Sequence, residues 1–215
     1  MKYLTQFFYK HIGRNVEYYN WFFVNIILHP QTVYETNKYQ HGLTQQWHRR
    51  DHAITKIVFF FNFVLSTIFA FTFVKGLWKV PYILFDFAIP LVTGVIISVI
   101  IFYLCKSSFT TGDSFTVRYS YDIHINAYFC YLLVSHILLF VLSPFLFRDS
   151  LWATFASNGV LLVSLAYYTY ITFLGYNILP FMKIPKTAAY APIAVFSLLL
   201  VFFSALGINV PLVLI

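Results

Sequence analysis

The sequence predicts an all-α polytopic membrane protein with five transmembrane helices, and three features of the 215-residue chain lead to this fold class. Apolar and aromatic residues make up 60% of the chain and charged residues only 10%, against about 25% in ordinary soluble domains. The mean hydropathy is +0.75. The apolar residues also gather in stretches long enough to cross a bilayer. This composition excludes a soluble globular domain, and it excludes intrinsic disorder because 26 Phe and 17 Tyr would be left in water.

Residues 1–56 are predicted to form a basic, aromatic cytosolic region that lies on the membrane surface. The stretch Val16–Leu28 packs aromatic and aliphatic residues around a few polar ones, and it is too short and too interrupted to span a bilayer. We expect it to be an amphipathic interfacial helix with Asn15 as its N-cap and a stop at Pro30. A second short helix is expected over Gln31–Tyr39.

A membrane domain is predicted over residues 57–215, because five apolar stretches of 18 residues or more occur there. Lys or Arg stands at or near the ends of these stretches. An odd number of spans places the two termini on opposite sides of the membrane. The predicted spans are 57–74, 82–104, 127–147, 156–179 and 188–210.

The distribution of Lys and Arg predicts the orientation. Seven of the fourteen precede the first span, two lie in the second connection and two in the fourth, which makes eleven on one side. The other side has three: Lys75, Lys79 and Arg148. Because cytosolic segments collect Lys and Arg, we expect a cytosolic N-terminus and a lumenal C-terminus. The same rule accounts for the net charge of +7 without a nucleic-acid partner.

Two predicted spans carry stripes of small or polar residues at four-residue intervals, which place the residues on one helix face. The second span has Asp86, Pro90, Gly94 and Ser98, and the fourth has Ser164, Tyr168 and Thr172. We interpret the first stripe as a close helix-packing face and expect the second to bond to neighbouring helices. Asp86 lies close enough to the lumenal end to reach water or Lys79.

His136 lies nine residues into the third predicted span, so it is expected near the centre of the bilayer. An ionisable side chain at that depth usually faces the interior of the helix bundle. Two interpretations stay open. The imidazole is either neutral and held by a hydroxyl or carbonyl of a neighbouring helix, or a proton-linked group of a transporter.

A polar cluster of Asp122, His124 and Asn126 stands where the chain re-enters the membrane from the cytosolic side. The alternative is that Asp122 caps the third helix and the other two are interfacial polar residues. Asp122 is also predicted to contact Arg49 or Arg50, because both segments lie within a few residues of the cytosolic end of a span. The two clusters would then form one cytosolic surface.

Enzymatic chemistry finds little support in the sequence. His48 and His52 are four residues apart, a spacing that membrane di-iron enzymes use, but those enzymes need several such clusters on one side of the membrane. The sequence contains no Gly-rich phosphate loop and no GxSxG or HExxH motif. We therefore predict a protein that is not an enzyme, with no metal site and no cofactor.

Three sequence blocks carry a resemblance to a known family. They are Pro30-Gln31-x-Val33-Tyr34 with Tyr39, Gln46-Trp47, Arg49 and Asp51; then Tyr121-Asp122-Ile123-His124-Ile125-Asn126-Ala127; then Tyr167-Tyr168-x-Tyr170-x-Thr172-Phe173-Leu174-Gly175-Tyr176-x-x-Leu179-Pro180-Phe181. In order and spacing, over about residues 20–210, they resemble the uncoordinated-fifty family of eukaryotic Golgi and endoplasmic-reticulum membrane proteins.

The chain also departs from the pattern of this family. Arg50 and His52 stand where the family tends to have an acid and a proline. Arg118 lies in Val117-Arg118-Tyr119, where family members often place Glu-Trp, and Cys130 replaces an expected proline. The fold should tolerate these changes, whereas charged partner contacts near Arg50 and Arg118 are expected to differ.

The resemblance implies a five-span protein of the early secretory pathway that functions in vesicular traffic, in association with exchange factors for Arf GTPases and in delivery of receptors to the cell surface. The predicted function is a non-enzymatic membrane adaptor whose partners are the bilayer, exchange factors or coat machinery, and membrane cargo. The alternative is a small membrane enzyme or proton-coupled transporter using His136 or the Asp122, His124 and Asn126 cluster. Candidate partner-binding or structural residues are Trp47, Arg49, Asp51, Asp122, His124, Asn126, His136, Gly175, Tyr176 and Pro180.

Two features bear on the compartment. The first predicted span has 18 residues between Lys56 and Lys75, about 27 Å of helix, which suits the thinner bilayer of the early secretory pathway. Cys105, beside Lys106 at the cytosolic interface, is a candidate palmitoylation site.

Overall fold

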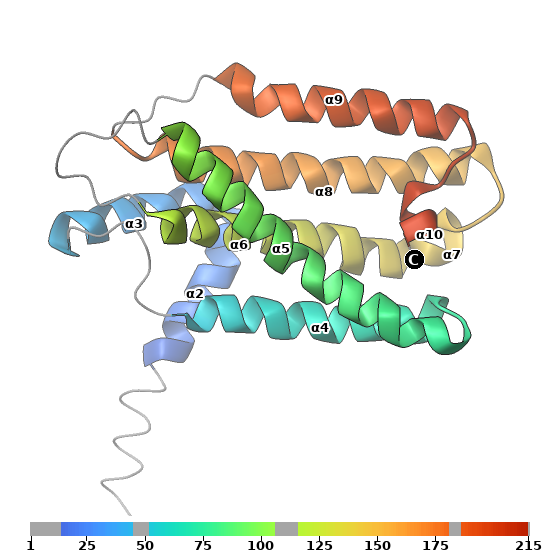
Figure 1. The fold of residues 1–215 in the computed structure, drawn as a ribbon, viewed down its shortest axis with the longest axis horizontal. Coiled ribbons are helices and arrows are strands. Elements are labelled where there is room, and N and C mark those ends of the chain that lie inside the picture. Colours follow the sequence, from blue (N-terminus) through green and yellow to red (C-terminus); the bar gives the residue numbers. More distant parts are fainter. Residues whose placement is uncertain (1–13, 45–51, 106–115, 181–185, 215) are drawn as a thin grey trace, which may run out of the picture. The chain divides into compact units, whose positions relative to one another are not determined.

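The computed structural model describes residues 14–44, 52–105, 116–180 and 186–214. These residues are helical apart from short connections, and no strand occurs among them. The chain divides into two units, Met1–Gln45 and Gln46–Ile215, which we describe separately. The helices are labelled in Figure 1. The predicted all-α class is confirmed.

The first unit contains two helices that pack against each other, α2 (Arg14–Leu28) and α3 (Pro30–Thr44). Pro30 opens α3, where the missing N–H of proline costs no helical hydrogen bond. The two predicted helices are present, but α2 begins one residue before Asn15, so Asn15 is not its N-cap. The second helix continues five residues beyond its predicted end at Tyr39.

The second unit is a bundle of long helices. It begins with α4 (Ala53–Phe73), a 3₁₀ turn η2 (Gly76–Trp78) and α5 (Lys79–Cys105). One continuous helical segment follows, made of α6 (Val117–Leu132), the π-helical segment η4 (Leu133–Leu138) and α7 (Leu139–Leu146). The last elements are α8 (Leu151–Asn177), α9 (Lys186–Ala205) and α10 (Val210–Leu214).

Within the described residues, four helical segments are long and apolar enough to cross a membrane: Ala53–Phe73, Gly76–Tyr103, Val117–Leu146 and Leu151–Asn177. A shorter apolar helix, Tyr190–Ala205, occupies the place of the fifth predicted span. The polytopic architecture is confirmed, with several shifted boundaries. The third segment starts at Val117 rather than at residue 127, and α9 ends at Ala205 rather than at residue 210. The first and fourth segments start at Ala53 and Leu151, four and five residues earlier than predicted.

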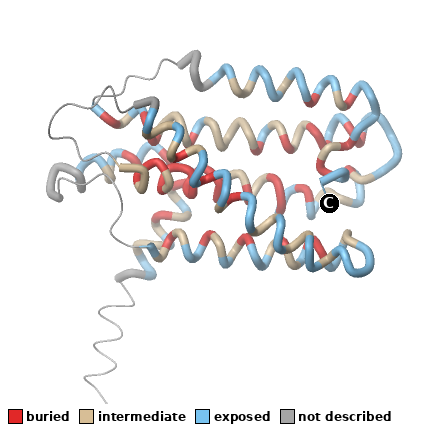
Figure 2. The backbone as a smooth tube through the Cα atoms, viewed as in Figure 1, coloured by how far each residue is buried: buried red, intermediate tan, exposed pale blue. Residues whose placement is uncertain are grey.

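The α6 helix is the centre of the bundle, because it packs against α4, α5 and α8. Its residues from Tyr119 to Cys130 are almost all buried, which Figure 2 shows as the red stretch of the tube. The outer helices α5 and α9 keep large apolar side chains exposed, among them Phe85 on α5 and Leu198 on α9. Exposed apolar faces of this kind suit contact with lipid.

The chain turns back into the bundle after α9, which the sequence did not predict. Gly207 has φ of +75°, a left-handed conformation that glycine adopts without strain. The short helix α10 then returns against α8 (Figure 1). Asn158 on α8 holds this turn through three hydrogen bonds: to the Ser204 hydroxyl (2.8 Å), to the Ile208 carbonyl (3.0 Å) and from the Val210 amide (2.9 Å).

Candidate functional site

A polar network inside the bundle begins at Pro90, in the middle of α5. Proline has no N–H, so the carbonyl of Asp86 loses its usual helical donor. The amide of Asn62 on α4 donates to that carbonyl at 3.3 Å, and the hydroxyl of Tyr128 on α6 donates to Asn62 Oδ1 at 2.8 Å. Asn62 is fully buried. The network thus satisfies a backbone group that could find no water in a membrane.

The carboxylate of Asp86 lies in the same network, and it faces His136. Asp86 Oδ2 lies 3.4 Å from His136 Nε2 and accepts a hydrogen bond from the hydroxyl of Ser66 on α4. His136 Nδ1 is 3.0 Å from the hydroxyl of Ser135, and the imidazole packs edge-on against Phe69. The structure therefore joins an acid and a base that lie 50 positions apart in the sequence.

The π-helical segment η4 carries both Ser135 and His136. A π turn holds one more residue than an α turn, so it rotates the following side chains relative to the regular helix, and such segments are frequent at functional sites. Both adjacent side chains are buried here. Sequence analysis found His136 but missed the π segment, because the apolar pattern around it is that of an ordinary membrane helix.

A cavity of about 140 Å³ borders this pair. Its polar wall contains Asp86, Ser135 and His136, together with three tyrosines: Tyr82, Tyr128 and Tyr131. Apolar side chains form the rest, including Pro211 and Leu214 from α10. The returning C-terminal segment therefore forms one side of the cavity.

Of the two contacts expected for Asp86, water or Lys79, the structure does not show the one with Lys79. Its ammonium group lies 4.8 Å from the centre of the Phe71 ring, a cation–π contact. The rest of the stripe on α5 behaves as expected for a packing face. Pro90 and Ser98 are fully buried, and Gly94 lies against α6.

His124 forms a different site, nearer the beginning of α6. Its Nε2 lies 3.1 Å from the carbonyl of Pro90, and its Nδ1 lies 2.7 Å from the hydroxyl of Tyr168 on α8. A carbonyl can only accept, so Nε2 donates to it. The tyrosine hydroxyl can donate to Nδ1, so these two partners fully satisfy a neutral imidazole. A Cβ at Gly94 would lie only 2.5 Å from His124 Cδ2, so glycine makes room for the ring.

The predicted cluster of Asp122, His124 and Asn126 does not converge. All three side chains are buried in the regular α6 helix. Residues two positions apart on an α-helix do not share a face, so His124 projects away from the other two. Asp122 is not the helix cap either. The N-cap is Thr116, whose hydroxyl accepts from the Tyr119 amide at 3.4 Å.

The N-terminal ends of α4 and α6 meet at a contact between His52 and Arg118. Arg118 Nη2 lies 2.9 Å from His52 Nε2. The two ends are therefore neighbours, which the predicted surface of Asp122 and Arg49 or Arg50 requires. Trp47, Arg49, Arg50 and Asp51 themselves lie outside the described residues, so the predicted contact stays a prediction.

The glycine-tyrosine block at the end of α8 contributes to packing. The Tyr119 hydroxyl donates to the Gly175 carbonyl at 2.8 Å, and a Cβ at Gly175 would lie 2.8 Å from the Ile123 side chain. Tyr176 is buried in a cluster with Tyr119 and Ile123. Pro180 is exposed in the turn that follows α8.

Ser164, Tyr168 and Thr172 on α8 were expected to bond to neighbouring helices. Among the hydrogen bonds described for these three residues, only that of Tyr168 reaches another helix, through His124 on α6. The Ser164 hydroxyl donates to the Leu161 carbonyl and the Thr172 hydroxyl to the Tyr168 carbonyl, both on α8 itself. Such bonds to the preceding turn satisfy a hydroxyl within its own helix.

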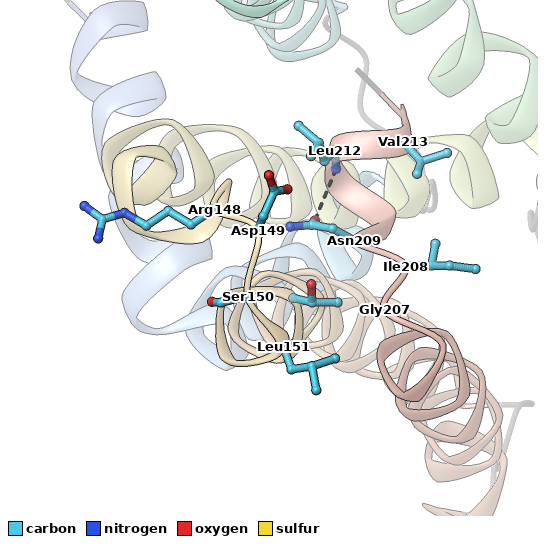
Figure 3. A pocket seen from close by; sticks show the side chains of 10 residues that line it. Arg148, Asp149, Ser150, Leu151, Gly207, Ile208, Asn209, Leu212 and Val213 are labelled. Carbon is cyan, nitrogen blue, oxygen red and sulfur yellow. Dashed lines mark hydrogen bonds between the residues drawn. The ribbon is translucent and has the colours of Figure 1, made fainter.

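A second, wider pocket of about 550 Å³ lies where the connection between α7 and α8 meets the C-terminal turn. Figure 3 shows its side chains, with Arg148 directed away from Asn209 and α10. Arg148 donates from Nε to the Pro144 carbonyl at 2.9 Å, and Asn209 donates to the Leu146 carbonyl at 3.0 Å. Arg148 and Asn209 thus bond to backbone carbonyls at the end of α7.

Among the described residues, no group of three or more His, Cys, Asp or Glu side chains is placed to hold a metal ion. His48 lies outside those residues, while His52 contacts Arg118 as described above.

Fold and site together define a polytopic α-helical membrane protein with a buried polar network in its bundle. The family model described as the UNC-50 family matches residues 4–215, and the chain belongs to this family.

The relatives extend over most of the chain. Protein unc-50 homolog A of Xenopus laevis is 30% identical, over 97% of this chain and 82% of its own length. The human unc-50 homolog is 28% identical over the same shares, and the Dictyostelium discoideum homolog is 28% identical over 79% of this chain and 69% of its own length. No solved structure matches the chain.

Proposed function

We propose that the protein is a non-enzymatic adaptor in the membranes of the Golgi and endoplasmic reticulum. It supports vesicular traffic by offering a cytosolic face to Arf exchange factors or coat machinery, while its helices accompany membrane cargo such as receptors. Family membership supports a membrane protein of this family. The adaptor role adds to this the functions that the resemblance implies.

The observation that carries the proposal is the separate N-terminal unit. Its helix α2 exposes apolar side chains, including Val24 (53% exposed) and Leu28 (64%), and α3 exposes Tyr39 (71%). Seven Lys and Arg lie between the N-terminus and residue 56. Exposed apolar residues beside basic ones suit the surface of an anionic leaflet and leave the unit available to cytosolic proteins.

The proposed orientation has a direct test. The sequence has no Asn-x-Ser/Thr acceptor, so an engineered glycosylation site reports without background. A site appended beyond Ile215 should be glycosylated, and one placed before Met1 should not. The opposite pattern would show that the N-terminus is lumenal, and the N-terminal unit could then not offer a cytosolic docking face.

The adaptor role is tested by purification from mild detergent and identification of the captured proteins. A variant with Arg49→Gln and Arg50→Gln should lose most of the captured exchange factor or coat protein. The matched variant with Lys75→Gln and Lys79→Gln removes the same charge on the other side and should keep it. Equal losses in both variants would argue against a cytosolic docking face at Arg49 and Arg50.

A second candidate function is a proton-coupled transporter, and one observation favours it. His136 lines a cavity and lies 3.4 Å from a carboxylate within the bundle. Ionisable pairs in such positions are common in proton-driven transporters. Proton movement in proteoliposomes, abolished by Asp86→Asn, would support transport. Vesicles as tight to protons as protein-free ones would exclude it.

A further inference from the structure

We propose that Asp86 and His136 together bind one exchangeable proton, and that the cavity beside α10 connects this proton to water. The site is independent of the adaptor function and does not require transport. Its ligand is the proton alone, delivered by hydronium and returned to water, so no bond between heavy atoms forms or breaks.

The charge of the pair favours a single bound proton. Without it, a carboxylate beside a neutral imidazole carries a net charge of −1, and with two protons the pair carries +1. With one proton the net charge is zero, whether the proton sits on Asp86 Oδ2 or on His136 Nε2, atoms that lie 3.4 Å apart. A low-dielectric interior penalises either net charge, so the singly protonated pair is the favoured state.

Within the part of the chain that the structure describes, the side chains around the pair provide no further charge that could replace this proton. The groups that face it are Asn62 and Ser66 from α4, Tyr82 from α5, Tyr128 and Tyr131 from α6, and Ser135 from η4. From α7, α8 and α10 come apolar side chains: Leu139, Leu161, Pro211 and Leu214. Tyrosine hydroxyls ordinarily keep their proton well above neutral pH. None of the facing groups named here is a Lys or an Arg.

The hydrogen bonds of Ser66 provide a second argument. Its hydroxyl carries one hydrogen but contacts two acceptors, the backbone carbonyl of Asn62 at 2.8 Å and the carboxyl group of Asp86. One hydrogen cannot fully satisfy both. When Asp86 carries the proton, the carboxyl donates to the Ser66 oxygen while Ser66 donates to Asn62. Both contacts are then complete, so the arrangement around Ser66 suits a protonated Asp86.

Water can reach the pair through the cavity. The side chains of His136 and Asp86 remain 11% and 20% exposed, so the pair is not sealed. A cavity of about 140 Å³ has room for a few waters, since each occupies about 30 Å³ in the liquid. Pro211 and Leu214 line the cavity and belong to α10, which follows the end of α9 that the proposed orientation makes lumenal.

The test follows both partners as pH is varied in the purified full chain in lipid nanodiscs. Infrared difference spectra report the Asp86 carboxylic acid band, assigned with Asp86→Asn. Nitrogen resonances of labelled histidine report His136, assigned with His136→Gln. If the pair binds one proton, the Asp86 carboxylic acid signal and the His136 imidazolium signal together account for one proton near about pH 8 in the wild-type protein, where an independent carboxylate and imidazole would bind almost none. A sum of zero protons or of two protons at that pH would overturn the proposal.

Variants measure the coupling. His136→Gln should move the Asp86 midpoint by at least about one pH unit, because sites that share a proton titrate as a pair. The matched control is His124→Gln, which changes a buried histidine of the same helical segment whose described partners are uncharged. It should leave the Asp86 midpoint where it is. An equal shift in both variants, or none in His136→Gln, would contradict a shared proton.

Discussion

Two histidines on the same continuous helical segment occupy opposite kinds of environment. His124 and His136 are 4% and 8% exposed, so burial does not distinguish them. His124 stands in regular α-helix between a backbone carbonyl and a tyrosine hydroxyl. His136 stands in the π-helical segment beside a carboxylate, next to a cavity.

The difference teaches that the chemistry of the partner, rather than depth or exposure, decides what a buried histidine can do. A carbonyl and a hydroxyl together satisfy both nitrogens of a neutral imidazole, and neither partner carries a charge that would stabilise the protonated ring. A carboxylate gives the imidazole a partner whose own charge depends on a proton. His124 is therefore a packing residue that joins α5, α6 and α8, while His136 can take part in proton exchange.

The largest expected effect comes from filling the space that His124 occupies. Gly94→Leu would drive a side chain into the imidazole, since even a Cβ would lie 2.5 Å from His124 Cδ2. We expect a loss of about 3 kcal/mol in the free energy of unfolding, at the upper end for overpacked cores. Unfolding in mixed micelles measures it.

Gly159→Leu is the matched control, because no atom outside its own helix lies within 4 Å of the Cβ position on α8. It should retain wild-type stability to within about 1 kcal/mol, given the better helix propensity of leucine. Similar losses for the two glycines would mean that the close contact at His124 does not limit the packing of α5 on α6.

Replacing each histidine should have intermediate effects that differ in kind. His124→Leu and His136→Leu each leave hydrogen-bonding partners unpaired, at a cost of about 1 to 3 kcal/mol. His136→Gln keeps a group of similar reach, so fold and function should largely persist. Both changes remove an imidazole that the unfolded chain protonates below about pH 6.5, so both alter how the stability depends on pH. They should differ in kind, because His124 stays neutral in the folded protein while His136 can share a proton with Asp86.

Unfolding of wild type and of the two leucine variants, repeated across pH 5 to 8, separates these cases. The cost of His124→Leu should become smaller toward pH 5, because only the unfolded chain protonates this imidazole and the variant removes that penalty. A cost of His136→Leu that falls toward pH 5 in the same way would show His136 to be a neutral structural residue like His124. Loss of function in a folded His136→Gln variant would instead make proton chemistry central to the activity.

The smallest expected effect is at Ser66, which contacts Asp86. Ser66→Ala removes a hydrogen bond to the acid and should cost about 1 kcal/mol. It should also shift the midpoint of the Asp86 infrared band, because a partner of the carboxyl is lost. Ser197→Ala on α9 is the control, since that hydroxyl bonds only to its own helix among the contacts described. A Ser66→Ala variant with an unchanged band would remove Ser66 from the protonation site.

Much of the architecture could be predicted from the sequence. The spans followed from the length of apolar stretches, and α2 and α3 from aromatic segments too short to cross. Boundaries failed where polar residues lay inside a helix. The third span was predicted to begin at residue 127 because Asp122, His124 and Asn126 looked like surface residues, yet the helix begins at Val117 and buries all three.

The site was predictable only as single residues. Asp86 and His136 each stood out as ionisable groups in apolar surroundings. Their pairing did not, because nothing local indicates that residues 50 positions apart face each other. The Asn62 amide that serves the carbonyl freed by Pro90 was also missed, since a lone asparagine in an apolar stretch shows no partner in sequence.

The sequence by itself determined the membrane class, because segments that cross a bilayer are predominantly apolar and must satisfy their backbone hydrogen bonds within the protein. Tertiary structure alone decided the chemistry inside the bundle. The π-helical segment aims His136, the packing of α4 and α5 brings Ser66 to Asp86, and the return of the chain at Gly207 places α10 beside the cavity. Each of these depends on which helix faces overlap, and a one-dimensional pattern does not contain that information.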